Sequence, residues 1–121
     1  MVVLALLVTA AAAQAAQRPW RVLGSGTAFG DFAVASATGH ATEPNALGVR
    51  VAVSRRQATT VYAVIGCAKR GAIGTKHQQL TGRGPFERAL GLPMARPDQC
   101  TIAVTASISK GGRLTVSALT R

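Results

Sequence analysis

Hydrophobic residues alternate with polar or small residues along much of this chain. The clearest run is Leu47–Val53, in which every second residue is hydrophobic and Gly48, Arg50 and Ala52 lie between. A β-strand with one face in a core and the other in water gives this pattern. Further alternating runs cover residues 61–67, 100–108 and 114–119, and weaker ones cover 20–23, 32–38 and 78–81.

Glycine, proline, serine and threonine separate these runs, and such residues favour turns. About seven short strands separated in this way are typical of an all-β sandwich or small barrel. We therefore expect an immunoglobulin-like antiparallel β-sandwich. The chain has 121 residues, a length that favours a single domain.

The two cysteines allow a test of strand pairing. If Cys67 lies opposite Cys100 in an antiparallel pair, Ile65 lies opposite Ile102, and the next pairs on that face are apolar as well. A one-sided sheet requires such matching. The register therefore predicts that the strands containing the two cysteines are neighbours.

A second pairing predicts a third strand in the same sheet. The segment Lys110–Gly112 separates two alternating runs and would place Ile108 opposite Leu114. Three-residue hairpin loops need a residue with positive φ, which glycine adopts without steric cost. The expected strand order is 60–67, 100–107 and 113–120.

The N-terminal residues have the composition of a targeting segment. Val2–Ala13 is uncharged and apolar, and a small-x-small site ends at Ala15. This arrangement predicts a secretory signal peptide over residues 1–16 and a mature domain over 17–121. The apolar run is shorter than the roughly 20 residues that cross a membrane as a helix. We expect a secreted or cell-envelope protein whose mature form lacks a membrane span; the alternative is a buried N-terminal helix or strand.

Export to an oxidising compartment predicts that the two cysteines form a disulfide. Cys67 and Cys100 are 33 positions apart. A metal site would need ligands at closer spacing, and His40 and His77 form no such pair with each other or with a cysteine. We therefore expect one disulfide and no metal.

The glycine-rich segment Gly24–Gly30 has the spacing G-x-G-x-x-x-G. A dinucleotide-binding loop would require a helix directly after it. Residues 31–35 alternate instead, so we interpret the segment as a kink or bulge between two edge strands.

Catalytic constellations are absent from the sequence pattern. None of the serines lies in a G-x-S-x-G segment, and the disulfide would leave no cysteine nucleophile. The four carboxylates fall in expected turns or loop margins: Asp31, Glu43, Glu87 and Asp98. We expect a protein that is not an enzyme and that needs no cofactor.

The chain has 14 Lys and Arg residues against four Asp and Glu residues, for a formal net charge of +10. Eleven of the cations are arginine, so the codon bias of a GC-rich genome, together with solubility, is one explanation. The other is an anionic partner. Nucleic-acid binding would favour aromatic residues interleaved with the cations, and this chain has only five aromatics. An anionic cell-envelope polymer or an acidic protein fits the expected location better.

Four cations fall in two expected loops. Arg55 and Arg56 follow one predicted strand, and Lys110 and Arg113 flank the predicted hairpin turn. In an immunoglobulin-like topology these two loops emerge at the same end of the sandwich. We expect them to form an anion-binding cluster with no carboxylate close by.

Two segments resemble those of small exported β-rich proteins of GC-rich bacteria. They are the stretch from Leu92-Pro93 through Pro97 to Cys100 and the closing hairpin Lys110–Val116. The resemblance covers residues 47–121 and implies an exported single domain, without indicating an activity.

The leading hypothesis is a secreted, non-catalytic domain that binds an anionic envelope polymer or an acidic partner. The alternative is an inhibitor or accessory partner of a secreted enzyme that uses the loop Leu92–Asp98. A small hydrolase with an unrecognised site is a weaker third hypothesis. The folded surface distinguishes these hypotheses. A deep pocket with convergent polar groups would favour the hydrolase, a protruding proline-rich loop would favour the inhibitor, and a flat basic end would favour the domain that binds a polyanion.

Overall fold

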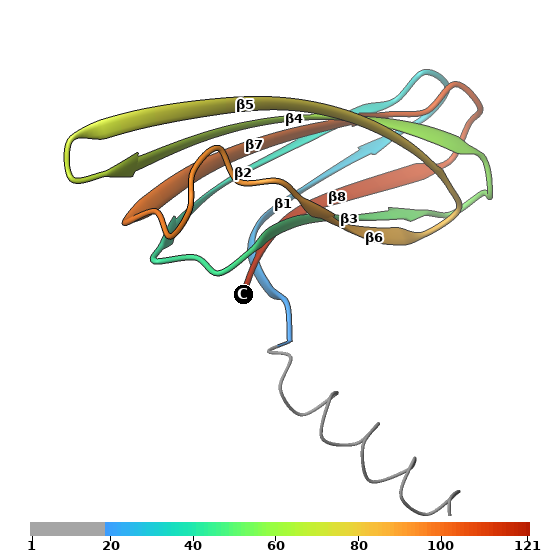
Figure 1. The fold of residues 1–121 in the computed structure, drawn as a ribbon. Coiled ribbons are helices and arrows are strands. Elements are labelled where there is room, and N and C mark those ends of the chain that lie inside the picture. The colour runs from blue at the N-terminus through green and yellow to red at the C-terminus, as the bar shows by residue number, and fades with distance from the viewer. Residues whose placement is uncertain (1–18) are drawn as a thin grey trace, which may run out of the picture.

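The computed structural model describes residues 19–121, so the predicted signal peptide lies outside the described residues. The described part consists of eight strands joined by turns and loops (Figure 1). The strands are β1 (Arg21–Phe29), β2 (Val34–Thr42), β3 (Leu47–Val53), β4 (Ala58–Lys69), β5 (Ala72–Arg83), β6 (Phe86–Leu90), β7 (Gln99–Ser107) and β8 (Arg113–Thr120). None of the described residues belongs to a helix long and apolar enough to cross a membrane.

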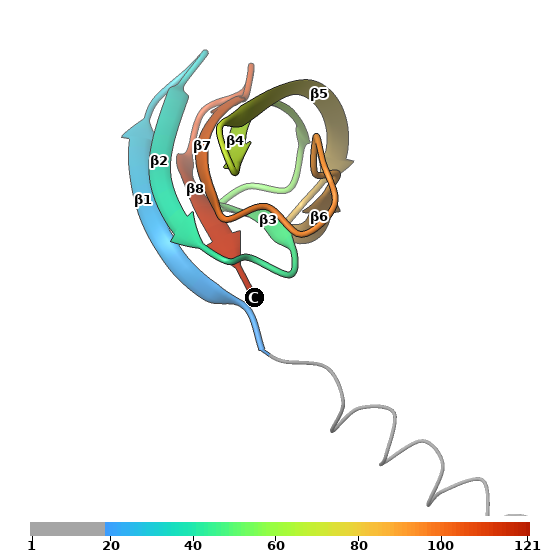
Figure 2. The ribbon, with the colours of Figure 1, turned by 60° about the vertical axis from the view of Figure 1, so that its left-hand side comes forward.

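The strands form two antiparallel four-stranded sheets packed face to face. One sheet has the order β1-β8-β3-β6 and the other the order β2-β7-β4-β5. Figure 2 shows β1 and β2 together at one edge of the sandwich and β5 and β6 at the other. The all-β antiparallel sandwich is confirmed. The order of its eight strands is that of a jelly roll, which corrects the expected immunoglobulin-like connectivity. The number of strands agrees with the expectation of about seven.

The register between β4 and β7 follows the sequence prediction. Cys67 lies opposite Cys100, and Ile65 lies opposite Ile102. The two cysteines form a disulfide with a Cα–Cα distance of 4.1 Å. The bridge therefore links neighbouring strands of one sheet, as expected.

The predicted hairpin between β7 and β8 is wrong. The loop at residues 108–112 crosses from one sheet to the other, and β8 pairs with β1 and β3. Val116 lies opposite Gly26 on one side and Val51 on the other. The inward residues of β8 match the apolar face of β3 as well as that of β7, so alternation alone does not select the partner.

Strand β5 is longer than the short strand predicted over 78–81. It joins β4 through a two-residue turn in which Arg70 and Gly71 have φ values of 49° and 85°. Positive φ at both positions suits the turn to a tight hairpin. At the edge of the sheet, Lys76 and Gln78 occupy inward positions beside Leu80, so the strand lacks hydrophobic alternation.

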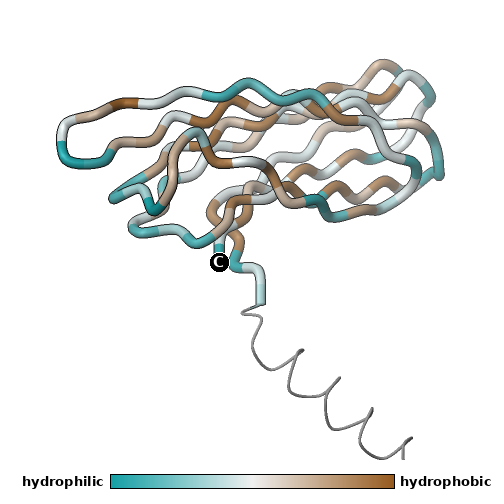
Figure 3. The backbone as a smooth tube through the Cα atoms, viewed as in Figure 1, coloured by the Kyte–Doolittle hydropathy of each residue, from teal (hydrophilic) through white to brown (hydrophobic). Residues whose placement is uncertain are grey.

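The core lies between the two sheets and consists of the inward residues of their central strands. The hydropathy colouring of Figure 3 alternates along these strands, whereas hydrophilic residues gather at the loops. The largest fully buried aliphatic side chains are those of Leu47, Ile65, Ile102, Leu114, Leu119, Val49, Val51, Val61, Val104 and Val116. Alanines from β2 complete the core where the sheets converge.

Glycines close the sandwich at the edge formed by β1 and β2. A Cβ atom added at Gly26 would lie 1.9 Å from the carbonyl oxygen of Ser36, and one at Gly24 would lie 2.1 Å from that of Thr38. The register of β1 also shifts between Val22 and Gly24. The bulge predicted in the glycine-rich segment is present at its start, but the segment lies within the edge strand β1 and not between two edge strands. Its glycines allow the backbones of β1 and β2 to approach each other closely.

Replacing Gly26 should open this edge. We expect Gly26→Ala to lower the free energy of unfolding by about 1–3 kcal/mol, because β1 and β2 must separate to admit the methyl group. Gly66→Ala is the matched control, since a Cβ there meets nothing within 4 Å and its effect should stay within about 1 kcal/mol. Urea unfolding of both variants measures the difference, and equal stabilities would contradict the account.

Candidate functional site

The two loops that carry the predicted cations lie at the same end of the sandwich. Residues 54–57 connect β3 to β4, and residues 108–112 connect β7 to β8. The Arg113 amide donates to Ser54 Oγ at 2.7 Å, and the Ser54 amide donates to the Arg113 carbonyl at 3.0 Å. The structure thus brings Arg55, Arg56, Lys110 and Arg113 to one region, although by a jelly-roll connection.

Gln57 holds the two basic loops together. Its side chain is 4% exposed, and its Oε1 accepts a hydrogen bond from the Lys110 amide at 2.8 Å. Its Nε2 lies 3.4 Å from the carbonyl oxygens of both Arg55 and Gly111. A buried amide that satisfies backbone groups of two loops fixes their relative position.

A fifth cation lies beside this cluster. Arg83 is the last residue of β5 and lies opposite Ala58, the first residue of β4. The amide of the next residue, Gly84, donates to the Gln57 carbonyl at 3.3 Å. The Arg56 guanidinium also lies against Gly84. We call Arg55, Arg56, Arg83, Lys110 and Arg113 the basic end.

The expectation that no carboxylate lies near these loops is wrong. Asp31 lies in the β1–β2 turn, and its Oδ1 would be 2.7 Å from a Cβ added at Gly111. The close approach of β1 and β2 brings this turn onto the β7–β8 loop, and the expected immunoglobulin-like topology did not place the two segments together. Among residues 19–121 the one side-chain ion pair is Arg50–Glu87, so Asp31 pairs with no cation of the basic end. The five cations of the basic end and the Asp31 carboxylate together carry a formal excess of four positive charges.

Two phenylalanines are displayed beside the basic end. Phe29 is 74% exposed and Phe32 is 76% exposed. The Phe32 amide donates to the Ser109 carbonyl at 3.3 Å, which attaches the turn to the β7–β8 loop. Phe32 also has a φ of 54°, a left-handed conformation that is costly for a bulky residue. Exposed aromatic side chains on a fixed turn are available to a ligand, and the segment Phe29–Phe32 was the available sequence signal.

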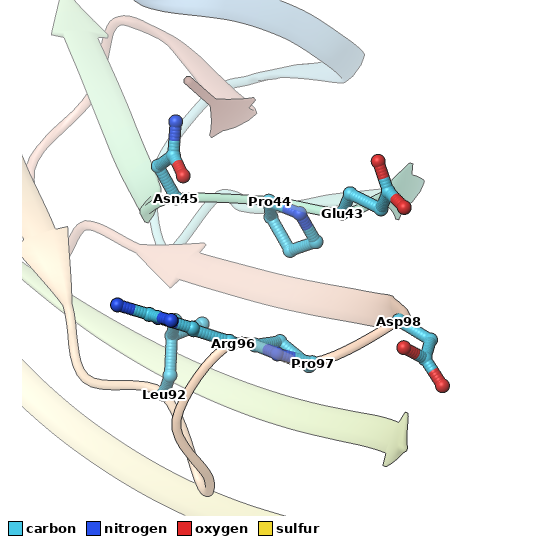
Figure 4. Close-up of a pocket in the computed structure, with 7 residues that line it drawn as sticks. All are labelled: Glu43, Pro44, Asn45, Leu92, Arg96, Pro97 and Asp98. Carbon is cyan, nitrogen blue, oxygen red and sulfur yellow. The ribbon is translucent and has the colours of Figure 1, made fainter. Parts of the chain in front are cut away.

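The opposite end of the molecule has a hollow of about 490 Å³ between the β2–β3 and β6–β7 loops. Figure 4 shows that the carboxylates of Glu43 and Asp98 point away from it, on the side opposite the Arg96 guanidinium. The two carboxylates therefore do not face a common space, as a carboxylate-based hydrolase would require.

The loop Leu92–Asp98, considered above as an inhibitory loop, is held against the body. The Asp98 amide donates to the Ala68 carbonyl at 2.9 Å, and Lys69 Nζ donates to the Ala95 carbonyl at 3.2 Å. Pro97 is buried. The loop thus lacks the protrusion expected of an inhibitor, whereas the basic loops are exposed.

No metal-binding group of three or more His, Cys, Asp or Glu side chains occurs within residues 19–121. His40 lies on an outward position of β2, 3.5 Å from Thr101 Oγ1. His77 lies on an outward position of β5, opposite Val64. Whether the protein is an enzyme stays a prediction from the sequence.

Neither the family models nor the sequences of curated proteins give a match to this chain. Solved structures do resemble it in fold. The Yersinia pseudotuberculosis-derived mitogen superposes with a TM-score of 0.50 at 10% identity, covering 87% of this chain and 88% of the mitogen. TmCBM61 in complex with β-1,4-galactotriose superposes with a TM-score of 0.48 at 8% identity, covering 84% of this chain and 86% of TmCBM61. The carbohydrate-binding module CBM36, in complex with calcium and xylotriose, superposes with a TM-score of 0.36 at 19% identity, covering 77% of this chain and 76% of the module.

Removing the Gln57 side chain should loosen the basic loops. Gln57→Ala leaves the Lys110 amide without its acceptor, and we expect a loss of about 1–3 kcal/mol in the free energy of unfolding. Hydrogen exchange at the Lys110 amide should also become faster. Gln79→Ala removes an exposed glutamine and should change stability by less than about 0.5 kcal/mol. Unchanged exchange at Lys110 would show that Gln57 does not hold the loops.

Proposed function

We propose that this domain is an exported, non-catalytic binding module that attaches to an anionic polysaccharide of the cell envelope through the basic end. The observation that carries the proposal is that five exposed cations lie on the loops and strand ends at one end of the sandwich, where one buried glutamine joins the β3–β4 and β7–β8 loops. Two exposed phenylalanines lie on the adjoining turn.

Electrostatics favours a polymer over a single small anion. The basic end has an excess of four positive charges on exposed side chains, which repel one another and attract counterions. A polyanion that contacts several of these side chains releases those counterions, and its binding then weakens steeply with salt. The loops are already positioned by Gln57 and Ser54, so little ordering entropy is lost on binding.

The phenylalanines add a second kind of contact. A sugar ring has an apolar face of C–H groups, and an aromatic side chain can pack against it. Phe29 lies opposite Arg113 in the register of β1 and β8, and Phe32 is hydrogen-bonded through its backbone to Ser109, the residue before Lys110. An acidic polysaccharide contains both carboxylates and ring faces, so it matches this combination better than an acidic protein surface does.

Binding to polygalacturonate, a polymer of uronic acids, tests the proposal. We expect binding that weakens as salt is raised from about 0.05 to 0.5 M and that is lost with the methyl-esterified polymer. Arg55→Gln with Arg56→Gln should reduce the affinity at low salt at least about tenfold. Arg88→Gln with Arg96→Gln removes the same charge away from the basic end and should have a smaller effect.

Equal losses in the two double variants would show that only the net charge matters and would contradict a localised site. Anionic phospholipid vesicles are the second control. Binding to vesicles without binding to polygalacturonate would replace the polymer with a membrane surface as the partner.

A further inference from the structure

The outward face of the sheet β2-β7-β4-β5 is almost free of charge. Alternation places about half of the residues of these strands on this face, and the register aligns them in rows across the sheet. The charged residue among them is Arg83, at the basic end. On a chain with a formal net charge of +10, a large uncharged face is unexpected and indicates a partner without charge.

Tyr62 lies at the centre of this face. It is 56% exposed, and its row across the four strands contains Ser36, Thr105 and Gln79. Val64, the next outward residue of β4, is 41% exposed. The centre therefore presents one aromatic ring and one aliphatic side chain, surrounded by hydroxyl and amide groups that both donate and accept hydrogen bonds.

A hollow of about 220 Å³ lies further along β4, above the disulfide. Gly66 lies at its base, with His40 and Thr101 on one side and Ile73 on the other. A Cβ added at Gly66 would meet nothing within 4 Å, and its φ is not left-handed, so the fold does not require glycine here. Glycine inside a strand weakens it and often marks a place where a ligand approaches closely.

We propose that this face is a second binding site, for an uncharged polysaccharide chain that lies along β4. In this arrangement a sugar ring packs its C–H face on Tyr62, and a second ring occupies the hollow above Gly66. The threonine, glutamine and histidine side chains on both sides of β4 exchange hydrogen bonds with the sugar hydroxyls. The occupant is identified by this chemistry: ring-shaped units with apolar faces, many hydroxyls and no charge.

Other occupants fit these features less well. An acidic polymer would find one cation on this face, Arg83 at the end of β5, and none beside Tyr62 or Gly66. A lipid surface would bury the threonine hydroxyls without partners. This site is separate from the basic end, so the two proposals stand or fall independently.

Calorimetric titration with soluble β-glucan, xylan, mannan and galactan tests the second site. At least one of these neutral polymers should bind, with an affinity that stays within about threefold between 0.05 and 0.5 M salt. Tyr62→Ala and Gly66→Val should each weaken that binding at least about tenfold. Circular dichroism should show that both variants fold, because Tyr62 is exposed and the space above Gly66 is open.

Matched variants on the opposite sheet control for general surface effects. Val22→Ala removes an exposed apolar side chain, and Ala52→Val adds one at an exposed strand position; both should bind as the unmodified protein does. Arg55→Gln with Arg56→Gln should also retain neutral-glycan binding, even if it loses polygalacturonate.

Two results would overturn the proposal. One is the absence of binding to all four polymers, or binding that Tyr62→Ala and Gly66→Val leave unchanged. The other is a concentration-dependent dimer that Tyr62→Ala dissociates, together with no glycan binding, which would assign the face to contact between copies.

Discussion

The antiparallel register between β4 and β7, locked by the Cys67–Cys100 disulfide, determines what each face of the molecule presents. Side chains alternate with a period of two, so a slip of one residue would exchange the two faces. In the observed register Ile65 and Ile102 point into the core, whereas Tyr62 and Thr105 point outward. The disulfide closes a loop of 33 residues and contributes about 3–4 kcal/mol in the chain-entropy description, which is large for a domain of this size.

The second constraint is the close approach of the two sheets at β1 and β2. Gly24 and Gly26 allow β1 to approach the backbone carbonyls of Thr38 and Ser36 in β2. The turn between β1 and β2 then contacts the β7–β8 loop. Four connections therefore meet at one end of the sandwich. Cations therefore lie on the loops and strand ends of the basic end, and the outward face of the disulfide-bearing sheet has Arg83, at that same end, as its one charged residue.

The alternation of hydrophobic and polar residues within single strands predicted part of the fold. The alternation of Leu47–Val53 and the matching of the two cysteine strands specify β3, β4 and β7 and the bridge between them. The partner of β8 could not be predicted, because its apolar face fits two different strands. The length of β5 was missed because an edge strand can place Lys76 and Gln78 on its inward face without burying them.

The candidate site was also predicted in part. Arg55, Arg56, Lys110 and Arg113 were expected at one end on the basis of immunoglobulin connectivity, and the jelly roll also brings these loops together. Asp31 and the exposed phenylalanines were missed because the β1–β2 turn reaches this end only through the closure of the sandwich. The order of residues along the chain does not show that closure, whereas Arg55, Arg56 and Lys110 can be assigned to their loops from the local sequence.

Backbone amide chemical shifts recorded during titration with an oligogalacturonate test most directly whether the basic end is a localised anion site. We expect perturbations confined to residues 29–33, 54–57, 83–85 and 108–113, the segments that meet at that end. Perturbations centred on residues 43–45 and 91–98, around the hollow at the opposite end, or spread evenly over all cationic residues, would contradict it.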